Sequence, residues 1–423
     1  MGPVRSRSRH PNGAPSAPAS NQDSLLGPQA LEQRLRSLFD RVAPFTVGAE
    51  EELLLVDAHT LLPAPAAEYA LALGAGDRRL AGELRSAQVE AMTPVCVSVA
   101  DVARELASIR RLVATGLGPD VLVVGTGAHP LTTDPGPLSS AQRYRRLAAE
   151  HPWAARSAVT CGLHVHVAVS GADRALAVYN ALRSYLPELL ALGANAPYYG
   201  GEDTGLATVR AKLNQSWPRA GVPPAFASWR ELAEFAVWAR DGGAMPEAGH
   251  QWWDLRLSAA HGTIELRVAD TQTRVDDAAT LIALAQSLVA DLAARHEAGE
   301  QLPVHRDERI VENMWLATRD GIGGHLIDPE TGARTWTADR LQELASSLMP
   351  TATTLGCDRE LLGIGRLVLD GGGAARQRGI VRRRGLESLL PKLAEETSSP
   401  TAEEAEARML GGEPATGTLG AWG

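Results

Sequence analysis

The spacing of apolar residues along the chain predicts several helices, each with a buried face. Apolar side chains recur every three or four positions over residues 102–113, 176–186 and 281–292. This is the period at which one stripe of an α-helix faces a protein core. Ser228 precedes Glu231 by three residues, which is typical of a capping box and predicts that another helix begins there.

Strand patterns alternate with these helices. Residues 46–56, 121–125, 162–169 and 263–268 are rich in aliphatic side chains and predict short strands. A further helix is expected over residues 338–348. The alternation of the two patterns indicates a mixed α and β protein, and the chain has no internal repeat.

The composition indicates a globular protein that does not bind nucleic acid or a membrane. The chain has 423 residues, 44% of them hydrophobic, with a formal net charge of -9 and a pI near 5.7. Nucleic-acid-binding surfaces are normally basic, so that class is disfavoured. The most apolar run, residues 281–294, is interrupted by polar residues and does not match the roughly 18 apolar residues of a membrane helix. The three cysteines form no CxxC pair, which indicates neither a disulfide framework nor a thiolate zinc site and favours a reducing cytoplasm.

Both ends of the chain are expected to be flexible tails. Residues 1–21 and 395–423 are rich in Pro, Ser, Gly, Ala and Glu and have few large apolar side chains to stabilise an ordered structure. No long linker divides the residues between them. Residues 22–394 are therefore expected to form a single catalytic domain with a helical C-terminal part.

The first candidate site lies in the first predicted strand, where residues 48–52 read GAEEE. The period of two puts Glu50 and Glu52 on one face of a strand and Glu51 on the other. Neighbouring carboxylates repel each other, so either water or a cation must face them. A magnesium ion, which prefers oxygen ligands, is the functional alternative to a solvated face.

The second candidate site lies in residues 161–167, which read CGLHVHV. The same alternation puts His164 and His166 on one side, opposite an apolar face. Two interpretations are open for this pair: a hydrogen-bonded structural role, or contact with a metal or ligand. Zinc is one option, although no third nitrogen or sulfur ligand stands close in the sequence.

The third candidate site lies in residues 262–270, which read GTIELRVAD. Glu265 and Arg267 share one face of this strand. They form either an ion pair of little energetic weight or a carboxylate for a metal beside a guanidinium for phosphate oxygens. Glu90, in the QVE segment 88–90, is expected to add a carboxylate to the same face.

Three strands thus share one design, an apolar face opposite a face of Glu, His and Arg. Such a surface suits phosphoryl transfer, which needs oxygen ligands for Mg²⁺ and cations to offset the charge of the moving phosphate. The chain contains no GxxxxGK[ST], HExxH or GxSxG motif. Their absence excludes a Walker-type cradle and weakens the protease and α/β-hydrolase interpretations.

Taken in order, these segments resemble the second family of glutamate–cysteine ligases, bacterial enzymes also described as carboxylate–amine ligases. The resemblance extends from about residue 45 to residue 378. It is carried by GAEEEL (48–53), QVE (88–90), TPVC (93–96), CGLHVHV (161–167), DTG (203–205), WPRAG (217–221), GTIELR (262–267), DT (270–271), EN (312–313) with Trp315, and RQR (376–378).

The resemblance implies an α+β fold similar to that of glutamine synthetase. In that fold a curved, mainly antiparallel sheet forms a funnel for ATP, metal ions and the acid substrate and is surrounded by helices. The implied metal-binding residues are Glu50, Glu52, Glu90, His164, Glu265 and, more loosely, His166. The implied catalytic residues are Arg267, on the phosphoryl group, and Glu52. Further nucleotide or substrate contacts would come from Arg210, Arg219, Arg376, Arg378 and Glu83, with a solvated surface role as the alternative for these arginines.

The implied reaction is the ATP-dependent joining of a carboxylate to an amine, with glutamate and cysteine as the expected example even if that activity is weak. The carboxylate would attack the γ-phosphate of ATP to give an acyl phosphate, and the amine would then displace phosphate. ATP and Mg²⁺ are the expected cofactors, and small molecules the expected partners, with a homo-oligomer as an option. The alternatives are a metal-dependent hydrolase that uses the His and Glu cluster, and a catalytically silent binding protein of the same fold.

Overall fold

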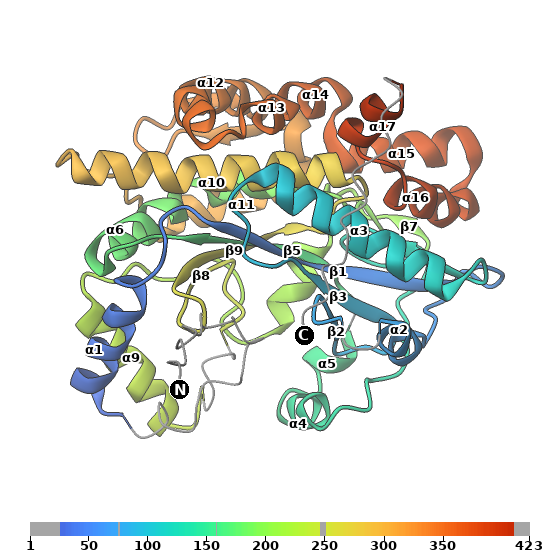
Figure 1. Cartoon of the computed structure of the whole chain (residues 1–423), viewed down its shortest axis with the longest axis horizontal. Helices are drawn as coiled ribbons and strands as arrows, with labels where there is room; N and C mark the ends of the chain where they lie inside the picture. Colours follow the sequence, from blue (N-terminus) through green and yellow to red (C-terminus); the bar gives the residue numbers. More distant parts are fainter. Residues whose placement is uncertain (1–25, 75–76, 158, 246–250, 410–423) are drawn as a thin grey trace, which may run out of the picture.

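The computed structural model describes residues 26–74, 77–157, 159–245 and 251–409. One seven-stranded sheet with antiparallel pairing lies at its centre (Figure 1). Its strands are β1 (Val47–Asp57), β2 (Leu80–Gly82), β3 (Gln88–Met92), β4 (Val121–Val124), β5 (Gly162–Ala168), β8 (Leu255–Ser258) and β9 (Thr263–Asp270). Two small hairpins are formed by β6 (Tyr198–Tyr199) with β7 (Glu202–Asp203) and by β10 (His325–Ile327) with β11 (Arg334–Trp336).

The order of the large sheet brings the predicted strands together. The strands follow one another as β2-β3-β1-β5-β9-β8, and β4 pairs with the second half of β1. β1, β5 and β9, the three strands that carry the candidate sites, are therefore direct neighbours. The predicted fold class, mixed α and β with a mainly antiparallel sheet, is confirmed, and the sheet is open rather than closed into a barrel.

Helices supply the rest of the structure. The first half of the chain contains α1 (Pro28–Phe39), α2 (Ala67–Leu73), α3 (Val99–Leu117), α4 (Gln142–Glu150), α5 (Ala154–Ser157), α6 (Ala172–Leu182), η2 (Arg183–Tyr185), α7 (Leu186–Gly193), α8 (Arg210–Leu213) and η3 (Asn214–Ser216). The second half contains α9 (Trp229–Asp241), α10 (Val275–Glu297), α11 (Asp307–Asp320), η4 (Gly321–Gly323), α12 (Thr337–Leu355), α13 (Asp358–Leu361), α14 (Gly363–Asp370), α15 (Gly372–Arg384), η5 (Leu386–Ser388), α16 (Leu389–Thr397) and α17 (Ala402–Met409).

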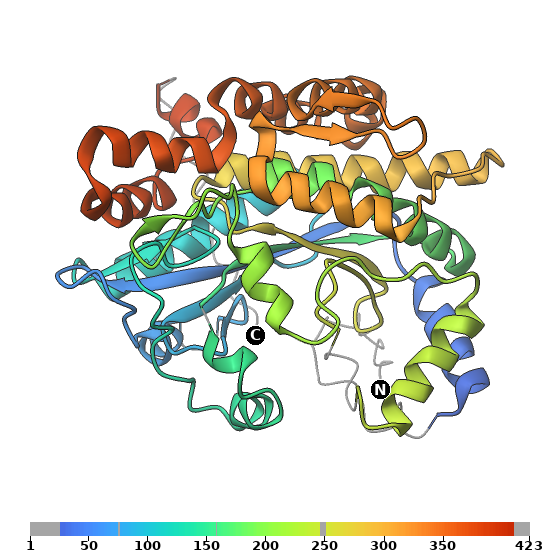
Figure 2. The same ribbon diagram turned by 180° about the vertical axis from the view of Figure 1, so that it is seen from behind.

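The two faces of the sheet have different surroundings. Figure 1 shows α10 and α3 across one face, with α12, α13 and α14 in a further layer beyond α10. On the other side, α1 and α9 stand at one end of the sheet and α2, α4 and α5 at the other, as the view from behind in Figure 2 also shows. The main hydrophobic core lies between the sheet and the α10 layer.

The helical periodicity was a reliable guide, with one exception. Residues 102–113 lie in α3 and residues 281–292 in α10, and the Ser228 hydroxyl accepts a hydrogen bond of 3.1 Å from the Glu231 N–H at the start of α9. The single helix predicted over residues 176–186 is instead divided into α6, η2 and α7. Pro187 stands in the first turn of α7, and because it has no N–H it cannot continue the α-helical ladder from α6.

Helix α10 is long and apolar enough to cross a membrane by composition alone. However, 89% of its most apolar stretch is buried inside the protein. Its side chains pack against α3, α6 and α12 and against β5. We therefore assign α10 as the core helix of this fold.

The predicted C-terminal tail is wrong in its first part. The end of α16 and the whole of α17 occupy residues 395–409. The Thr397 hydroxyl is buried and accepts a hydrogen bond of 2.9 Å from the Gly125 N–H. Thr401 and Glu404 cap α17 reciprocally, with distances of 3.1 and 3.2 Å. Composition alone gave no sign of these specific contacts. The arm 1–21 and residues 410–423 lie outside the described residues, so their flexibility stays a prediction.

A buried ion pair fixes which face of β1 points toward the helices. Glu51 and Arg110 of α3 are both fully buried and form two hydrogen bonds, of 2.8 and 2.6 Å. The same guanidinium donates to the backbone carbonyls of Gln272 and Thr273, each at 2.8 Å. Since side chains alternate along a strand, Glu50 and Glu52 must lie on the opposite face.

A second buried carboxylate, that of Asp270, lies at the end of β9. Asp270 is fully buried and accepts hydrogen bonds from the Asn195 N–H at 2.6 Å and the Thr208 hydroxyl at 2.9 Å. Burial raises its pKa to about 6, although Arg210 and these hydrogen bonds act in the opposite direction. A carboxyl group whose folded-state pKa is raised binds protons more tightly in the folded protein, so its ionisation lowers stability as pH rises toward 6.

The buried pair leads to a prediction about stability. Arg110→Met should lower the free energy of unfolding by about 3–5 kcal/mol, because it leaves the Glu51 charge buried without a partner. Reversible urea unfolding measures this loss. Arg111→Met is the matched control, since Arg111 pairs with Glu404 at the surface and its loss should cost less than about 1 kcal/mol. Equal effects of the two substitutions would contradict the role given to the buried pair.

Asp270 leads to a prediction about pH. Between pH 5 and pH 7.5 the unfolding free energy of Asp270→Asn should rise relative to wild type by about 1 kcal/mol, because the variant no longer pays for ionising a buried carboxylate. Urea unfolding of both proteins at the two pH values gives the difference. If the difference in unfolding free energy between variant and wild type is constant with pH, or changes in favour of wild type, the Asp270 carboxyl group is not protonated preferentially in the folded state.

Candidate active site

The candidate site is built on the sheet face opposite the Glu51–Arg110 pair. Glu52 lies directly across from Glu90 in the β1–β3 pairing, and Glu50 lies directly across from His164 in the β1–β5 pairing. Residues that face each other across antiparallel strands have Cβ atoms only about 5 Å apart. The two pairings therefore collect three carboxylates and an imidazole on one surface.

The neighbouring strands continue this row of polar side chains. Glu50 lies 3.4 Å from the Nδ1 atom of His164 and 3.4 Å from the Nε2 atom of His166. His166 stands opposite Glu265 in the β5–β9 pairing, and their side chains approach to 4.0 Å. The structure thus brings the three predicted pairs, one on each strand, into one shared site.

An irregularity in the β5–β9 pairing places Arg267 within this group. The register shifts between Leu163 and Val165, so His164 faces an extra residue of β9. Such bulges turn a side chain away from its regular direction. The Arg267 guanidinium lies 3.3 Å from the His164 Nδ1 atom and forms an ion pair with Glu265. The guanidinium that was predicted to meet phosphate oxygens therefore stands beside the carboxylates.

Two of the carboxylates have cationic or imidazole partners within the protein. For Glu50, burial opposes ionisation, but His164 and His166 outweigh it and lower the pKa far below its usual range. For Glu265, which is fully buried, Arg256, His166 and Arg267 likewise overcome burial and lower the pKa strongly. Both groups are therefore ionised at neutral pH.

Two other carboxylates lack such compensation. Burial and the Glu52 charge raise the pKa of Glu83 to about 7. Burial, followed by the charges of Glu83, Glu50 and Glu52, raises the pKa of Glu90 well above its usual value. The β1–β3 side of the site therefore gathers more carboxyl groups than the protein alone keeps ionised, and a cation that replaces their protons would be stabilised there.

The donor atoms fit a divalent cation. Ligand atoms of Glu50, Glu90 and His164 lie within 4.8 Å of one another, as do those of Glu50, His166 and Glu265. The buried Nε2 atom of His166 makes no hydrogen bond of good geometry among the described residues and lies 3.4 Å from Glu50 and 4.0 Å from Glu265. Carboxylate oxygens dominate both groups, which suits Mg²⁺ better than a softer metal.

Not every predicted ligand is equally available to a metal. Both oxygens of Glu265 are engaged by guanidinium groups, one from Arg256 at 2.5 Å and the other from Arg267. Glu52 accepts a hydrogen bond of 2.7 Å from the Gly162 N–H. The metal-binding roles of all six predicted ligands stay predictions, and the first set of donors, around Glu50 and Glu90, is the better candidate.

Arg210 and Arg219 differ in their relation to the site. Arg210 is buried and donates to the carbonyl oxygens of Arg267 at 3.1 Å and Val268 at 3.3 Å, so it supports the irregular part of β9. Arg219, which has a left-handed backbone φ of 59°, donates to the carbonyl of Ala244 at 3.1 Å. Nucleotide contact by these two residues stays a prediction.

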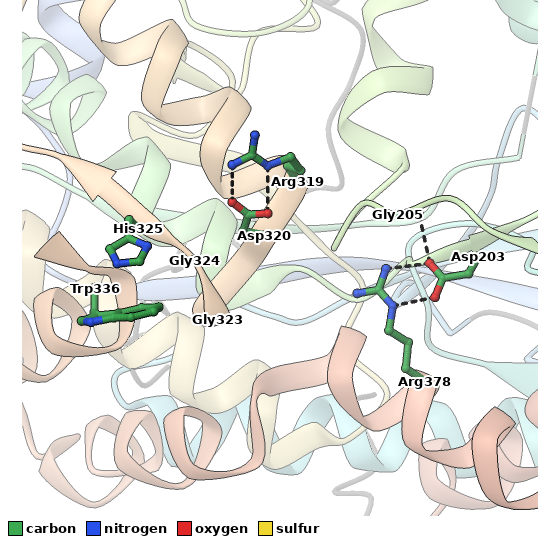
Figure 3. Close-up of a pocket in the computed structure, with 9 residues that line it drawn as sticks. All are labelled: Asp203, Gly205, Arg319, Asp320, Gly323, Gly324, His325, Trp336 and Arg378. Carbon is green, nitrogen blue, oxygen red and sulfur yellow. Dashed lines mark hydrogen bonds and ion pairs between the residues drawn. The ribbon is translucent and has the colours of Figure 1, made fainter. Parts of the chain in front are cut away.

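Arg376 and Arg378 lie elsewhere in the structure. Arg376 pairs with Asp277 of α10 at 2.8 Å, and this carboxylate is fully buried. Arg378 forms two hydrogen bonds with Asp203, of 2.8 and 2.7 Å. Figure 3 shows this second pair at the edge of a cleft, which has a volume of about 690 Å³. Its lining residues include none of the carboxylates of β1, β3 and β9. Both arginines therefore have protein partners outside the carboxylate group, which favours a structural role over the predicted nucleotide contact.

Arg256 is a site residue that the sequence interpretation missed. It lies opposite Glu265 on β8, the short strand that had not been predicted. A signal was present, because residues 253–257 read WDLRL and alternate between apolar and charged side chains. The strand is only four residues long, which is too short for that alternation to stand out.

Comparison with known proteins gives a consistent family assignment. Residues 46–405 match the family described as Glutamate-cysteine ligase family 2. A Rubrobacter xylanophilus protein named "Putative glutamate–cysteine ligase 2-3" is 39% identical over 373 residues, which cover 86% of this chain and 100% of the relative. A Thermobifida fusca protein named "Putative glutamate–cysteine ligase 2" is 34% identical over 306 residues, which cover 72% of this chain and 77% of the relative.

Solved structures share the fold at low sequence identity. A Francisella tularensis glutamate–cysteine ligase in complex with AMP superposes with a TM-score of 0.61 at 13% identity, covering 88% of this chain and 93% of the other. A bifunctional glutathione synthetase from Pasteurella multocida superposes with a TM-score of 0.57 at 15% identity, covering 88% of this chain and 54% of the other. These similarities concern the fold alone.

The acidic donor set leads to a prediction about cation binding. Glu50→Gln should weaken Mn²⁺ binding about tenfold or more, because Glu50 belongs to both donor groups and even outer-shell changes at metal sites cost about 10-fold. Electron paramagnetic resonance of free Mn²⁺ measures the affinity. Glu234→Gln, on the exposed side of α9, is the control and should bind as wild type does. Equal Mn²⁺ affinity in all three proteins would refute a cation site at Glu50.

Proposed function

Because the chain belongs to glutamate–cysteine ligase family 2, we propose that this ATP-dependent ligase joins the side-chain carboxylate of glutamate to an amine such as that of cysteine. One observation most directly supports placing this reaction at the site described above. Arg267, Glu265, the two histidines and Glu50 stand in a single row across β9, β5 and β1, so that cationic and anionic groups are available together. The family assignment argues against the alternative of a metal-dependent hydrolase.

The first step would activate the acid. A carboxylate oxygen of glutamate attacks the γ-phosphorus of ATP, the bond from that phosphorus to ADP breaks, and ADP leaves with the bonding electrons. Arg267 would hold the oxygens of the moving phosphoryl group, since a guanidinium fork matches phosphate geometry. Bound magnesium, held by Glu50, Glu90 and His164 with Glu52 alongside, would neutralise phosphate charge.

The second step would form the amide. The amine nitrogen, after losing a proton, attacks the carbonyl carbon of the acyl phosphate, the carbon–oxygen bond to phosphate breaks, and inorganic phosphate leaves. The nitrogen then releases its second proton. Positioning of the two substrates and neutralisation of charge are the contributions that the side chains can make, and no covalent intermediate with the protein is required.

The cysteine residues support a mechanism without a protein nucleophile. Cys96, Cys161 and Cys357 are buried and unpaired. Burial raises the pKa of Cys96 to about 11, and that of Cys161 still further. The reactive species of a cysteine is the thiolate, so these thiols are unreactive at neutral pH. Their reduced state also supports the proposal that the protein acts in the cytoplasm.

The proposed activity can be tested without knowing the natural amine. Purified protein with ATP, Mg²⁺, glutamate and hydroxylamine should release ADP and form glutamyl hydroxamate, because hydroxylamine traps an acyl phosphate. Arg267→Ala should lower the rate by about 10²–10³-fold, the usual cost of losing one donor to developing charge. Arg230→Ala, which removes an exposed arginine from α9, should leave the rate unchanged. If wild type forms hydroxamate without ATP, or forms none with it, the proposal is wrong.

A further inference from the structure

The chain that leads into β8 extends the site beyond Arg256. The Arg267 N–H donates to the Asp254 carbonyl at 2.8 Å, which continues the β8–β9 pairing by one residue and puts Asp254 opposite Arg267. Trp253 and Leu255 are buried in the main core. Because side chains alternate, Trp252, Asp254 and Arg256 point the other way, to the face that carries Glu265 and Arg267.

Three aromatic rings meet at the end of this row. The indoles of Trp217 and Trp252 are stacked, with ring centroids 4.9 Å apart and planes at 26°. His151, which follows α4, meets both edge-on, at 6.0 Å from Trp217 and 5.5 Å from Trp252. A bridge between Gly221 and Trp253 ties the loop that contains Trp217 to the start of β8. We call Trp217, Trp252 and His151 the aromatic wall.

The Asp254 carboxylate has no hydrogen bond or ion pair with any residue in the described part of the chain. Burial raises its pKa to about 6, while Arg210 and Arg267 act in the opposite direction, so it is ionised at neutral pH. A half-buried carboxylate without a protein partner can bind a cation in place of water. The position beside Arg267 is also where an amine would approach an acyl phosphate held by that guanidinium.

We propose that Asp254 binds the ammonium group of the acceptor amine and that the aromatic wall receives the apolar part of the same molecule. This inference rests on the proposed ligase function and narrows its acceptor to an amine with a bulky apolar or aromatic side chain, in preference to the smaller cysteine. Aromatic rings give such side chains a large contact surface, and they also favour a nearby cation.

The same aromatic wall could instead stack on the adenine ring of ATP, but the neighbouring carboxylate argues against this. ATP carries several negative charges, and placing Asp254 near it without a cation between them would weaken binding. An acceptor that is itself a cation gains from the same charge. Adenine stacking predicts a different result in the experiment below, namely a changed KM for ATP.

Asp254→Asn separates amine binding from activation. With phenylalanine, cysteine and alanine as acceptor probes, this variant should show at least a tenfold higher KM for each acceptor that wild type uses. Any fall in hydroxamate formation should be at least fivefold smaller than the fall in amide formation with these acceptors, because hydroxylamine is small and uncharged at pH 8 and needs no carboxylate to bind it. Asp120→Asn, at an exposed position, should match wild type in both assays.

Trp252→Ala tests the aromatic wall. Wild type should prefer phenylalanine to alanine as the acceptor, and this preference should fall at least fivefold in Trp252→Ala while hydroxamate formation persists. Trp238→Ala, which removes an exposed tryptophan from α9, is the control and should keep the preference. The assignment is overturned if wild type makes hydroxamate but does not prefer phenylalanine, or if the Asp254 and Trp252 variants change the KM for ATP instead. If wild type forms no hydroxamate, the proposed function itself is refuted. This outcome differs from one in which hydroxamate forms but the acceptor assignment fails.

Discussion

The bidentate contact between Glu51 and Arg110 is the constraint on which the functional face of the sheet depends. A strand with three consecutive glutamates could turn either the middle one or the outer two toward the helices, and a shift of one residue would exchange its two faces. The buried Arg110 guanidinium is compatible with only one of these arrangements, because it also donates hydrogen bonds to two backbone carbonyls that follow β9. Burying two charges has a high desolvation cost, so the gain lies more in the uniqueness of the register than in net stability.

Once this register is set, the site follows from strand order. β3, β1, β5, β9 and β8 lie side by side, and each contributes one or two polar residues at the same level of the sheet. The charges are distributed unevenly along this row. At the β9 side, two arginines face the single charge of Glu265. At the β3 side, Glu83 and Glu90 have raised pKa values and form no ion pair with any described residue. The row therefore has a cationic end and an acidic end, which suits a phosphoryl group at the first and a metal cation at the second.

The local part of this arrangement could be predicted from the sequence, and the non-local part could not. A period of two was enough to place Glu50 with Glu52, His164 with His166, and Glu265 with Arg267, because alternation is a property of each strand alone. The irregular β5–β9 register, which turns Arg267 toward His164, depends on contacts between distant segments. The partners of Arg376 and Arg378 come from α10 and from the β6–β7 hairpin, so a cluster of arginines in the sequence said little about their role.

The position of β8 bears on how the two halves of the reaction are divided in space. The strands with the metal-binding and phosphoryl-binding candidates each have neighbours on both sides, which hold their side chains in fixed positions. Among the described strands, β8 ends the sheet and pairs only with β9. Its leading segment is joined to the loop at Gly221 by a bridge at Trp253. Substitutions at Trp217 and Trp252 leave the carboxylates of β1 and β3 and the Arg256–Glu265 pair in place, so the proposed acceptor site can vary while the residues proposed for activation are retained.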